Sequence, residues 1–330
     1  MIEVLLRGQG GWNAMKRREL LKTTGQAMAL AAVTGNLGLF TSACQSRVFR
    51  KTRKPKPNFA VENDPRLPNI ILSRNVDNAF ALAAALEAIG GIGRFIKPGE
   101  KVLLKPNLAW DRTPLQAANT SPKIVGEMVR QCRNAGAVDV IVTDYGGGNA
   151  ERIFSRSGVR EAVERNGGRM VVVSDDDFVE DDLNGKFASA CPVLKYVFEV
   201  DRLINMPIAK HHTLALGSAG MKNFFGAIGG RRDRLHSKID QAIVDLGAYF
   251  RPTLTVVDAT RVLVRNGPGG GSVSDVEVFD SVIVSTDQVS ADARAAEFIA
   301  VNPREIGYLV LAAQQGLGEM DYRKAGYLEI

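Results

Sequence analysis

Short apolar runs alternate with longer amphipathic stretches along this chain beyond residue 68. The apolar runs 101–105 and 253–257 have the length and composition of buried strands, whereas the segment 122–134 has the periodicity of a helix. Alternating strands and helices favour a mostly parallel sheet, because each helix returns the chain to start the next strand in the same direction. We therefore expect an α/β fold with a mostly parallel sheet and helices on both faces. The sequence further predicts two lobes around a cleft, at 69–250 and 251–330.

The first 44 residues resemble a twin-arginine export signal. Arg17 and Arg18 stand shortly before a mildly apolar run at 27–40, and small residues precede Cys44. Polar residues and glycines interrupt this run, which is also shorter than the roughly 20 residues that a membrane-spanning helix needs. We expect the twin-arginine translocase to export the folded protein to the periplasm. Two outcomes stay open at Cys44: lipid attachment, which anchors the protein to the membrane, and cleavage just before it, which releases a soluble protein.

Residues 45–68 are expected to form a basic tether. Six lysines and arginines without an acid stand between residues 47 and 56, and such a tether is attracted to anionic lipid. Without residues 1–56 the chain keeps 31 basic and 34 acidic residues, so the excess positive charge belongs to the leader and tether. The remaining chain has no basic stripe and no zinc-finger spacing. We therefore expect no nucleic-acid partner.

The segment 205–236 concentrates groups that can carry chemistry. It holds all three histidines of the chain (His211, His212 and His236) together with Lys222, among glycines and other small residues. Glycines let a backbone approach a ligand closely. Imidazoles ligate transition metals or act as general bases, and a lysine in a partly dry pocket loses part of its preference for charge. The alternative is a set of satisfied core histidines beside a solvated basic turn.

Polar residues also follow the predicted strands. Lys105 and Asn107 stand at the end of the strand 101–105, and Asp258 follows the strand 253–257. In open α/β sheets, ligands bind beyond the carboxyl ends of the strands. An ammonium and an amide at such an end suit a small anion, so we expect Lys105 and Asn107 to bind one. A lysine that only reaches solvent at the sheet edge is the alternative.

Together these residues resemble the family called domain of unknown function 362. The matching motifs are Lys105-Pro106-Asn107, Gly220–Asn223 with Gly226 and His236, Asp258-Ala259, Asn266–Pro268, and Ser285–Asp287 followed by Ala291-Asp292. The resemblance covers about residues 69–326. Members are often labelled iron–sulfur proteins because some carry a ferredoxin-like module. This chain has no CxxC motif, so we expect no cluster within it, and a separate iron–sulfur redox partner stays open.

The same segment is more distantly similar to the nickel-dependent lactate racemases. Their order of a histidine, a glycine-rich lysine segment and a second histidine is matched by His212, Gly217, Gly220, Lys222 and His236. The resemblance implies that Lys222 holds a pincer-type nickel cofactor and that His236 ligates the metal. The chain departs from that family at Asp144, where the racemases have a second catalytic histidine.

We expect an exported enzyme that binds a small anionic ligand with a cofactor, either a transition metal such as nickel or a pincer-type organometallic group. Its chemistry would be hydride or proton transfer. The expected roles are catalysis by His212, Lys222 and Asp258, cofactor binding by Lys222, Asn223 and Gly220, substrate binding by Lys105 and Asn107, and metal ligation by His236 and His212. The alternative is a non-catalytic periplasmic binding or cofactor-assembly protein.

Overall fold

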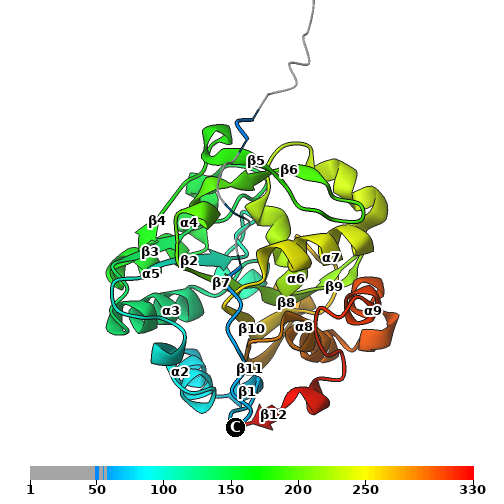
Figure 1. Cartoon of the computed structure of the whole chain (residues 1–330). Helices are drawn as coiled ribbons and strands as arrows, with labels where there is room; N and C mark the ends of the chain where they lie inside the picture. The colour runs from blue at the N-terminus through cyan, green and yellow to red at the C-terminus, as the bar shows by residue number, and fades with distance from the viewer. Residues whose placement is uncertain (1–48, 52–54, 56–57) are drawn as a thin grey trace, which may run out of the picture. The chain divides into compact units, whose positions relative to one another are not determined.

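The structure is a computed structural model that describes residues 49–51, 55 and 58–330 (Figure 1). The predicted export signal at 1–44 lies outside the described residues, as does part of the predicted tether. Residues 49–330 form one compact unit. Within the described ranges, no helix is both long enough and apolar enough to cross a membrane.

A ten-stranded sheet forms the centre of the described part, in the order β12-β1-β11-β10-β7-β2-β3-β4, with β8 paired to β10 and β9 paired to β8 (Figure 1). Its strands are β1 (Ile70–Arg74), β2 (Lys101–Pro106), β3 (Asp139–Val142), β4 (Arg169–Met170), β7 (Arg202–Met206), β8 (Ile208–His212), β9 (Leu216–Ser218), β10 (Leu254–Leu263), β11 (Val276–Ser285) and β12 (Tyr327–Glu329). Most neighbours are parallel, whereas β11 is antiparallel to β1 and β10, and β9 is antiparallel to β8. A separate antiparallel pair joins β5 (Phe178–Asp182) and β6 (Ala190–Leu194).

Helices cover both faces of this sheet. They are α2 (Asn78–Ala88), α3 (Pro122–Asn134), α4 (Ala150–Arg156), α5 (Val159–Arg165), α6 (Gly220–Asn223), α7 (Ile239–Phe250), α8 (Gln288–Ala296) and α9 (Gly307–Gln314). Neighbouring side chains of a strand point to opposite faces. In β2, Leu103 accordingly packs in the core with α6 to α9, while Val102 and Leu104 pack in the core with α2 to α5. The predicted α/β fold, mostly parallel and covered on both faces, is confirmed.

The helix predicted at 122–134 begins and ends where expected. Pro122 occupies the first helical position of α3, where its fixed φ suits a helix and its missing N–H is not needed. Gly136, which follows the end of α3, has φ of 92°, a backbone conformation that side chains disfavour. These two local signals set the boundaries independently of the packing.

The strand predicted at 253–257 continues further than expected. β7 ends at Met206, but β8 takes over the parallel pairing with β10, so β10 extends to Leu263. Asp258 therefore lies inside β10 and not at its end. Its side chain is fully buried and accepts hydrogen bonds from Ser121 N (2.7 Å), Thr260 N (3.0 Å) and Thr260 Oγ1 (2.7 Å). These contacts give Asp258 a structural role at the register shift after Ala259.

Two separate lobes are not confirmed. Strands β10 and β11, from the predicted second lobe, pair with β7 and β1 of the predicted first lobe. One continuous sheet thus passes through the predicted boundary near residue 251. The chain returns to the edge of the sheet at its very end, where β12 pairs with β1.

Candidate functional site

A cavity of about 580 Å³ lies at the carboxyl ends of β2 and β3 and beside β8. Asn107 directly follows β2, and Asp144 follows β3 by two residues. The other polar and aromatic side chains that line it include Trp110, Tyr145, Lys210, His212, Lys222, Asn223, Phe225, Arg232, Asp233 and His236. The cavity lies where ligands bind in open α/β sheets.

A second hollow, of about 650 Å³, lies among residues 297–304 and 320–323. None of the residues predicted for the site reaches it, and its Arg323 is paired with Glu297 at 3.4 Å. The smaller cavity is therefore the stronger candidate, since it combines several cations with polar side chains from four separate parts of the chain.

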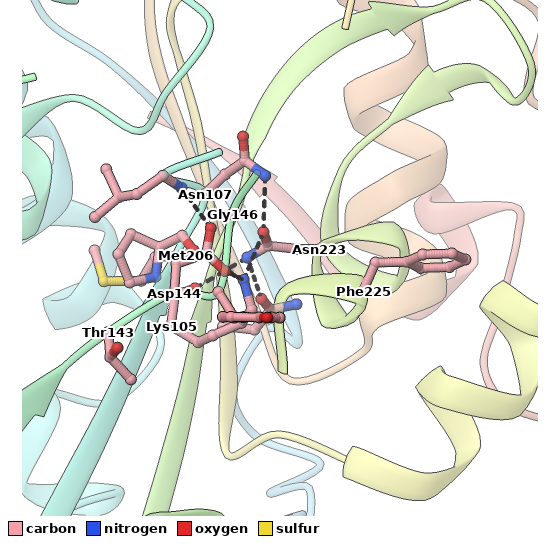
Figure 2. Close-up of polar contacts among 12 residues, drawn as sticks. Lys105, Asn107, Thr143, Asp144, Gly146, Met206, Asn223 and Phe225 are labelled. Carbon is pink, nitrogen blue, oxygen red and sulfur yellow. Dashed lines mark hydrogen bonds and ion pairs between the residues drawn. The ribbon is translucent and has the colours of Figure 1, made fainter. Parts of the chain in front are cut away.

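A buried polar network supports the cavity (Figure 2). Lys105 is 1% exposed, and its Nζ donates to Asp144 Oδ1 (2.5 Å), Asn223 Oδ1 (3.0 Å) and Pro106 O (3.0 Å). Asp144 Oδ2 in turn accepts from Leu108 N at 2.6 Å. An ammonium group has three hydrogens, so these acceptors complete the hydrogen bonding of Lys105. Lys105 thus binds the protein itself and is not among the residues that line the cavity, where the sequence predicted it to bind an anion.

Asn223 joins this network to the cavity wall (Figure 2). Its Nδ2 donates to Lys105 O (2.9 Å) and Asn205 Oδ1 (2.8 Å), and its Oδ1 accepts from Lys105 Nζ and from Asn107 Nδ2 (3.1 Å). Asn107 Oδ1 then accepts from Lys210 Nζ at 2.8 Å. Asn223 and Asn107 both line the cavity as predicted residues, and these bonds fix the orientation of their amides.

Two glycines of the segment, Gly220 and Gly226, lie close to carboxylates of the protein. A Cβ at Gly226 would lie 1.8 Å from Asp144 Oδ1, and one at Gly220 would lie 2.7 Å from Asp292 Oδ1. Asp292, in α8, accepts from Gly220 N (2.5 Å) and Met221 N (3.1 Å), so it binds the N-terminus of α6. At these two positions the close approach that a glycine allows is to a buried acid, where the sequence predicted a ligand.

The side chain of Lys222, in α6, makes no hydrogen bond or ion pair with any residue that the structure describes. It is 9% exposed, lines the cavity, and places its Nζ 3.8 Å from the centre of the Phe225 ring. Burial, together with the nearby charges of Arg232 and Lys105, lowers the pKa of Lys222 to about 8. Its amine is therefore available to a ligand.

Strand β8 brings Lys210 and His212 to one face, because side chains alternate along a strand. Both are buried, while His211 points the other way and its Nδ1 accepts from Gly267 N at 3.2 Å. Lys210 Nζ donates to Asn107 Oδ1 and to Ala118 O (2.7 Å). Burial and the charge of Lys222 lower the pKa of Lys210 to about 7.

The hydrogen bonds of His212 assign its protonation. Nδ1 accepts from Leu214 N (3.1 Å) and Ala215 N (3.3 Å), so the neutral ring carries its hydrogen on Nε2. Burial and the charge of Lys222 lower the pKa of His212 to about 3, which keeps the ring neutral at pH 7. A metal needs a nitrogen lone pair, but the lone pair of Nδ1 accepts two backbone N–H groups and Nε2 carries the hydrogen. This arrangement fits a hydrogen-bond donor and does not fit the predicted metal ligand.

His236 is exposed at the edge of the cavity. Its ring packs edge-on against Phe225, with 5.2 Å between ring centres, and burial and the charge of Lys222 lower its pKa. Phe225 therefore contacts both Lys222 and His236, the two residues that the racemase resemblance implied for a cofactor. Across the described residues, no group of three or more His, Cys, Asp or Glu side chains is placed to hold a metal ion.

Lys210 and Arg232 are cavity residues that the site prediction missed. Arg232 donates to Tyr145 O (2.5 Å) and Phe225 O (3.0 Å), and its guanidinium lies 4.6 Å from the centre of the Tyr145 ring. Arg232 belongs to the basic turn that the alternative interpretation of the sequence took to be solvated. The alternation of β8 was the signal that could have paired Lys210 with His212.

Comparisons with known proteins give a family match and two similar proteins. The chain matches the family described as "Domain of unknown function (DUF362)" over residues 102–297. A curated relative, "Thylakoid-associated protein sll1697" of Synechocystis sp. (strain ATCC 27184 / PCC 6803 / Kazusa), is 26% identical over 254 residues, which cover 72% of this chain and 74% of that protein. The solved lactate racemase apoprotein from Thermoanaerobacterium thermosaccharolyticum superposes with a TM-score of 0.44 at 12% identity, covering 74% of this chain and 61% of that one. Every predicted site residue lies within the matched family range.

Replacing Gly226 by alanine tests the packing against Asp144. Because the new Cβ would overlap Asp144 Oδ1, the buried ion pair has to move, and we expect a loss of about 1–3 kcal/mol in the free energy of unfolding. Urea denaturation measures this loss. Gly147→Ala is the matched control, since nothing lies within 4 Å of its Cβ and its stability should be unchanged. Equal stability of both variants would contradict the close approach.

Lys222→Met tests whether the folded protein disfavours the charged form of this lysine. The pKa is lower in the folded protein, about 8, than in the unfolded chain, about 10.5, so the unfolded chain binds the proton more tightly. Stability of the wild type should therefore rise between pH 8 and pH 10.5. Lys222→Met should be more stable below pH 8, by up to about 3 kcal/mol, and this gain should vanish above pH 10.5.

Chemical denaturation across this pH range, in buffer without multivalent anions, measures the effect. The control is Lys123→Met, at an exposed position of α3, which should match the wild type at every pH. A Lys222→Met variant that is less stable at pH 7 would show that the ammonium has stabilising contacts.

Proposed function

We propose a function for this chain, which belongs to the family described as "Domain of unknown function (DUF362)", from its cavity. The protein is an enzyme that binds a small anionic ligand and transfers a proton. The observation that carries this proposal is the charge of the cavity. Lys210, Lys222 and Arg232 line it together, and Lys222 has no acidic partner among the described residues. A ligand with a carboxylate or phosphate group would supply the missing negative charge.

The acids near these cations are already engaged. Of the acids that line the cavity in the described part, Asp144 is paired with Lys105 at 2.5 Å and Asp233 with Arg231 at 3.1 Å. The cations therefore remain in excess, and partial burial strengthens their attraction for an anion. The volume of about 580 Å³ suits a small molecule, since such sites typically measure about 300–1,000 Å³.

Proton transfer is supported by the setting of Lys222. A group that both takes and gives a proton near neutral pH needs a pKa close to that pH, and the pKa of Lys222 is about 8. Lys210 also has a lowered pKa, but its ammonium is held by Asn107 and Ala118. His212 would donate its Nε2 hydrogen to a ligand oxygen as negative charge develops there.

The cofactor stays a prediction. Hydride transfer would need a group that these side chains do not supply, and a nickel or pincer-type group bound beside Phe225 would be held by Lys222 and His236. His212 is not part of that set, because its hydrogen bonds do not fit metal ligation. A separate iron–sulfur redox partner also stays a prediction.

Anion binding should weaken as Lys222 loses its proton. We expect phosphate and oxalate to bind to the wild type at pH 7 and to bind more weakly at pH 9, above the pKa of about 8. Lys222→Met should lose about tenfold in affinity at pH 7, which corresponds to about 1.4 kcal/mol. Isothermal titration calorimetry measures both effects, and Lys123→Met should bind as the wild type does.

The proposed site would be contradicted if neither phosphate nor oxalate binds at pH 7. It would also be contradicted if Lys222→Met binds these anions as tightly as the wild type does. Exchange of carbon-bound hydrogen of a small carboxylate in heavy water, followed by proton NMR, then separates an enzyme from a binding protein. Retained binding without exchange would favour the non-catalytic binding or assembly protein.

We also propose that the protein reaches the periplasm through the twin-arginine translocase, on the strength of Arg17 and Arg18 before the apolar run. Replacing both by lysine should leave the protein in the cytoplasm, as measured by cell fractionation. Replacing Arg47 and Arg50 by lysine, in the tether, is the matched control and should not change export. Normal periplasmic accumulation of the first variant would exclude this route. Anchoring through Cys44 stays a prediction.

A further inference from the structure

The lysines around the cavity differ in how many acceptors surround them. Lys105 Nζ has three and Lys210 Nζ has two, whereas Lys222 Nζ has none in the part of the chain that the structure describes. An ammonium that is removed from water without acceptors is unfavourable, so this setting favours the neutral amine. A neutral lysine amine is a nucleophile toward carbonyl carbon.

The amine of Lys222 is also held in place. Asp292 binds the backbone N–H groups of Gly220 and Met221 at the start of α6. The side-chain hydrogen bonds of Asn223 hold the end of α6. The face of Phe225 lies 3.8 Å from Nζ and limits where the side chain can move. A reactive group held by its surroundings pays little of the entropic cost of reaction.

The groups beside Lys222 can hold a carboxylate next to a reacting carbonyl. Lys210 and Arg232 supply positive charge at the same cavity, and His212 supplies an N–H donor. Arg232 already donates to backbone carbonyls, so its contribution is the charge. These features together select a ligand that carries an anionic group and a carbonyl group close to each other.

We propose that Lys222 forms an imine with a small 2-keto or aldehyde acid bound in this cavity, an inference that rests on the proposed function. Nζ attacks the carbonyl carbon and forms a carbon–nitrogen bond. The carbonyl oxygen leaves as water with the two hydrogens of the neutral amine, so nothing is oxidised or reduced. The imine nitrogen takes up one proton from solvent and then withdraws electrons from the neighbouring carbon, which makes a hydrogen on that carbon easier to remove. Once bound in the imine, Lys222 does not take that proton itself, so the proton passes to another base or to water.

Reductive trapping tests the imine. The full chain is incubated with pyruvate and cyanoborohydride, which reduces an imine to a stable secondary amine, and the adduct is located by peptide mass spectrometry. We expect the adduct on Lys222 at no less than ten times the level on the exposed Lys123. Lys222→Arg keeps the positive charge but cannot form the adduct, and it should still bind pyruvate by calorimetry. In Lys123→Arg, the adduct on Lys222 should form at the same level as in the wild type.

The outcomes separate this inference from the proposed function. An adduct spread equally over exposed lysines overturns the imine, as does phosphate binding at the Lys222 site without any adduct from pyruvate. Both of these results leave the anion site intact. The absence of both anion binding and adduct overturns the two proposals together. Because the adduct is mapped on the wild-type chain, the test does not depend on the folding of any variant.

Discussion

The ion pair between Lys105 and Asp144 determines much of what surrounds the cavity. Two charges removed from water are favourable only if each is also fully hydrogen-bonded, and here Asn223, Pro106 O and Leu108 N complete the set. The pair leaves no room for a side chain at Gly226. The glycine at 226 and the asparagine at 223 are thus explained by one buried pair, which joins β2 to α6 and to the residues after β3.

This pair also explains why the cavity is positive. Asp144 is committed to Lys105, so it cannot neutralise Lys210 or Lys222, and the acids nearest the cavity are used within the fold. Lys222 remains without an acceptor in the described part, although burial disfavours its charge. Proteins tolerate such local costs mainly where a ligand relieves them. The arrangement is therefore better explained by binding than by stability.

The sequence could predict the fold because strands buried on both faces are continuous apolar runs, and because Pro122 and Gly136 mark the ends of α3. Of the residues predicted for the site, Asn107, His212, Lys222, Asn223 and His236 line one cavity. The sequence could not distinguish the role of Lys105 from that of Lys222, since both are lysines near strand ends. The difference lies in acceptors that are 39 and 118 residues away from Lys105. The tautomer of His212 likewise depends on the backbone path after β8.

The contact of Asp292 with α6 sets an order of events during synthesis. Ribosomes release a chain from its N-terminus, so Gly220 and Lys222 emerge about seventy residues before Asp292. Until then the N–H groups at the start of α6 lack their carboxylate, and β1 lacks β12, which emerges later still. A nascent chain can therefore not present a finished cavity. The cavity is completed only when most of the chain has been translated.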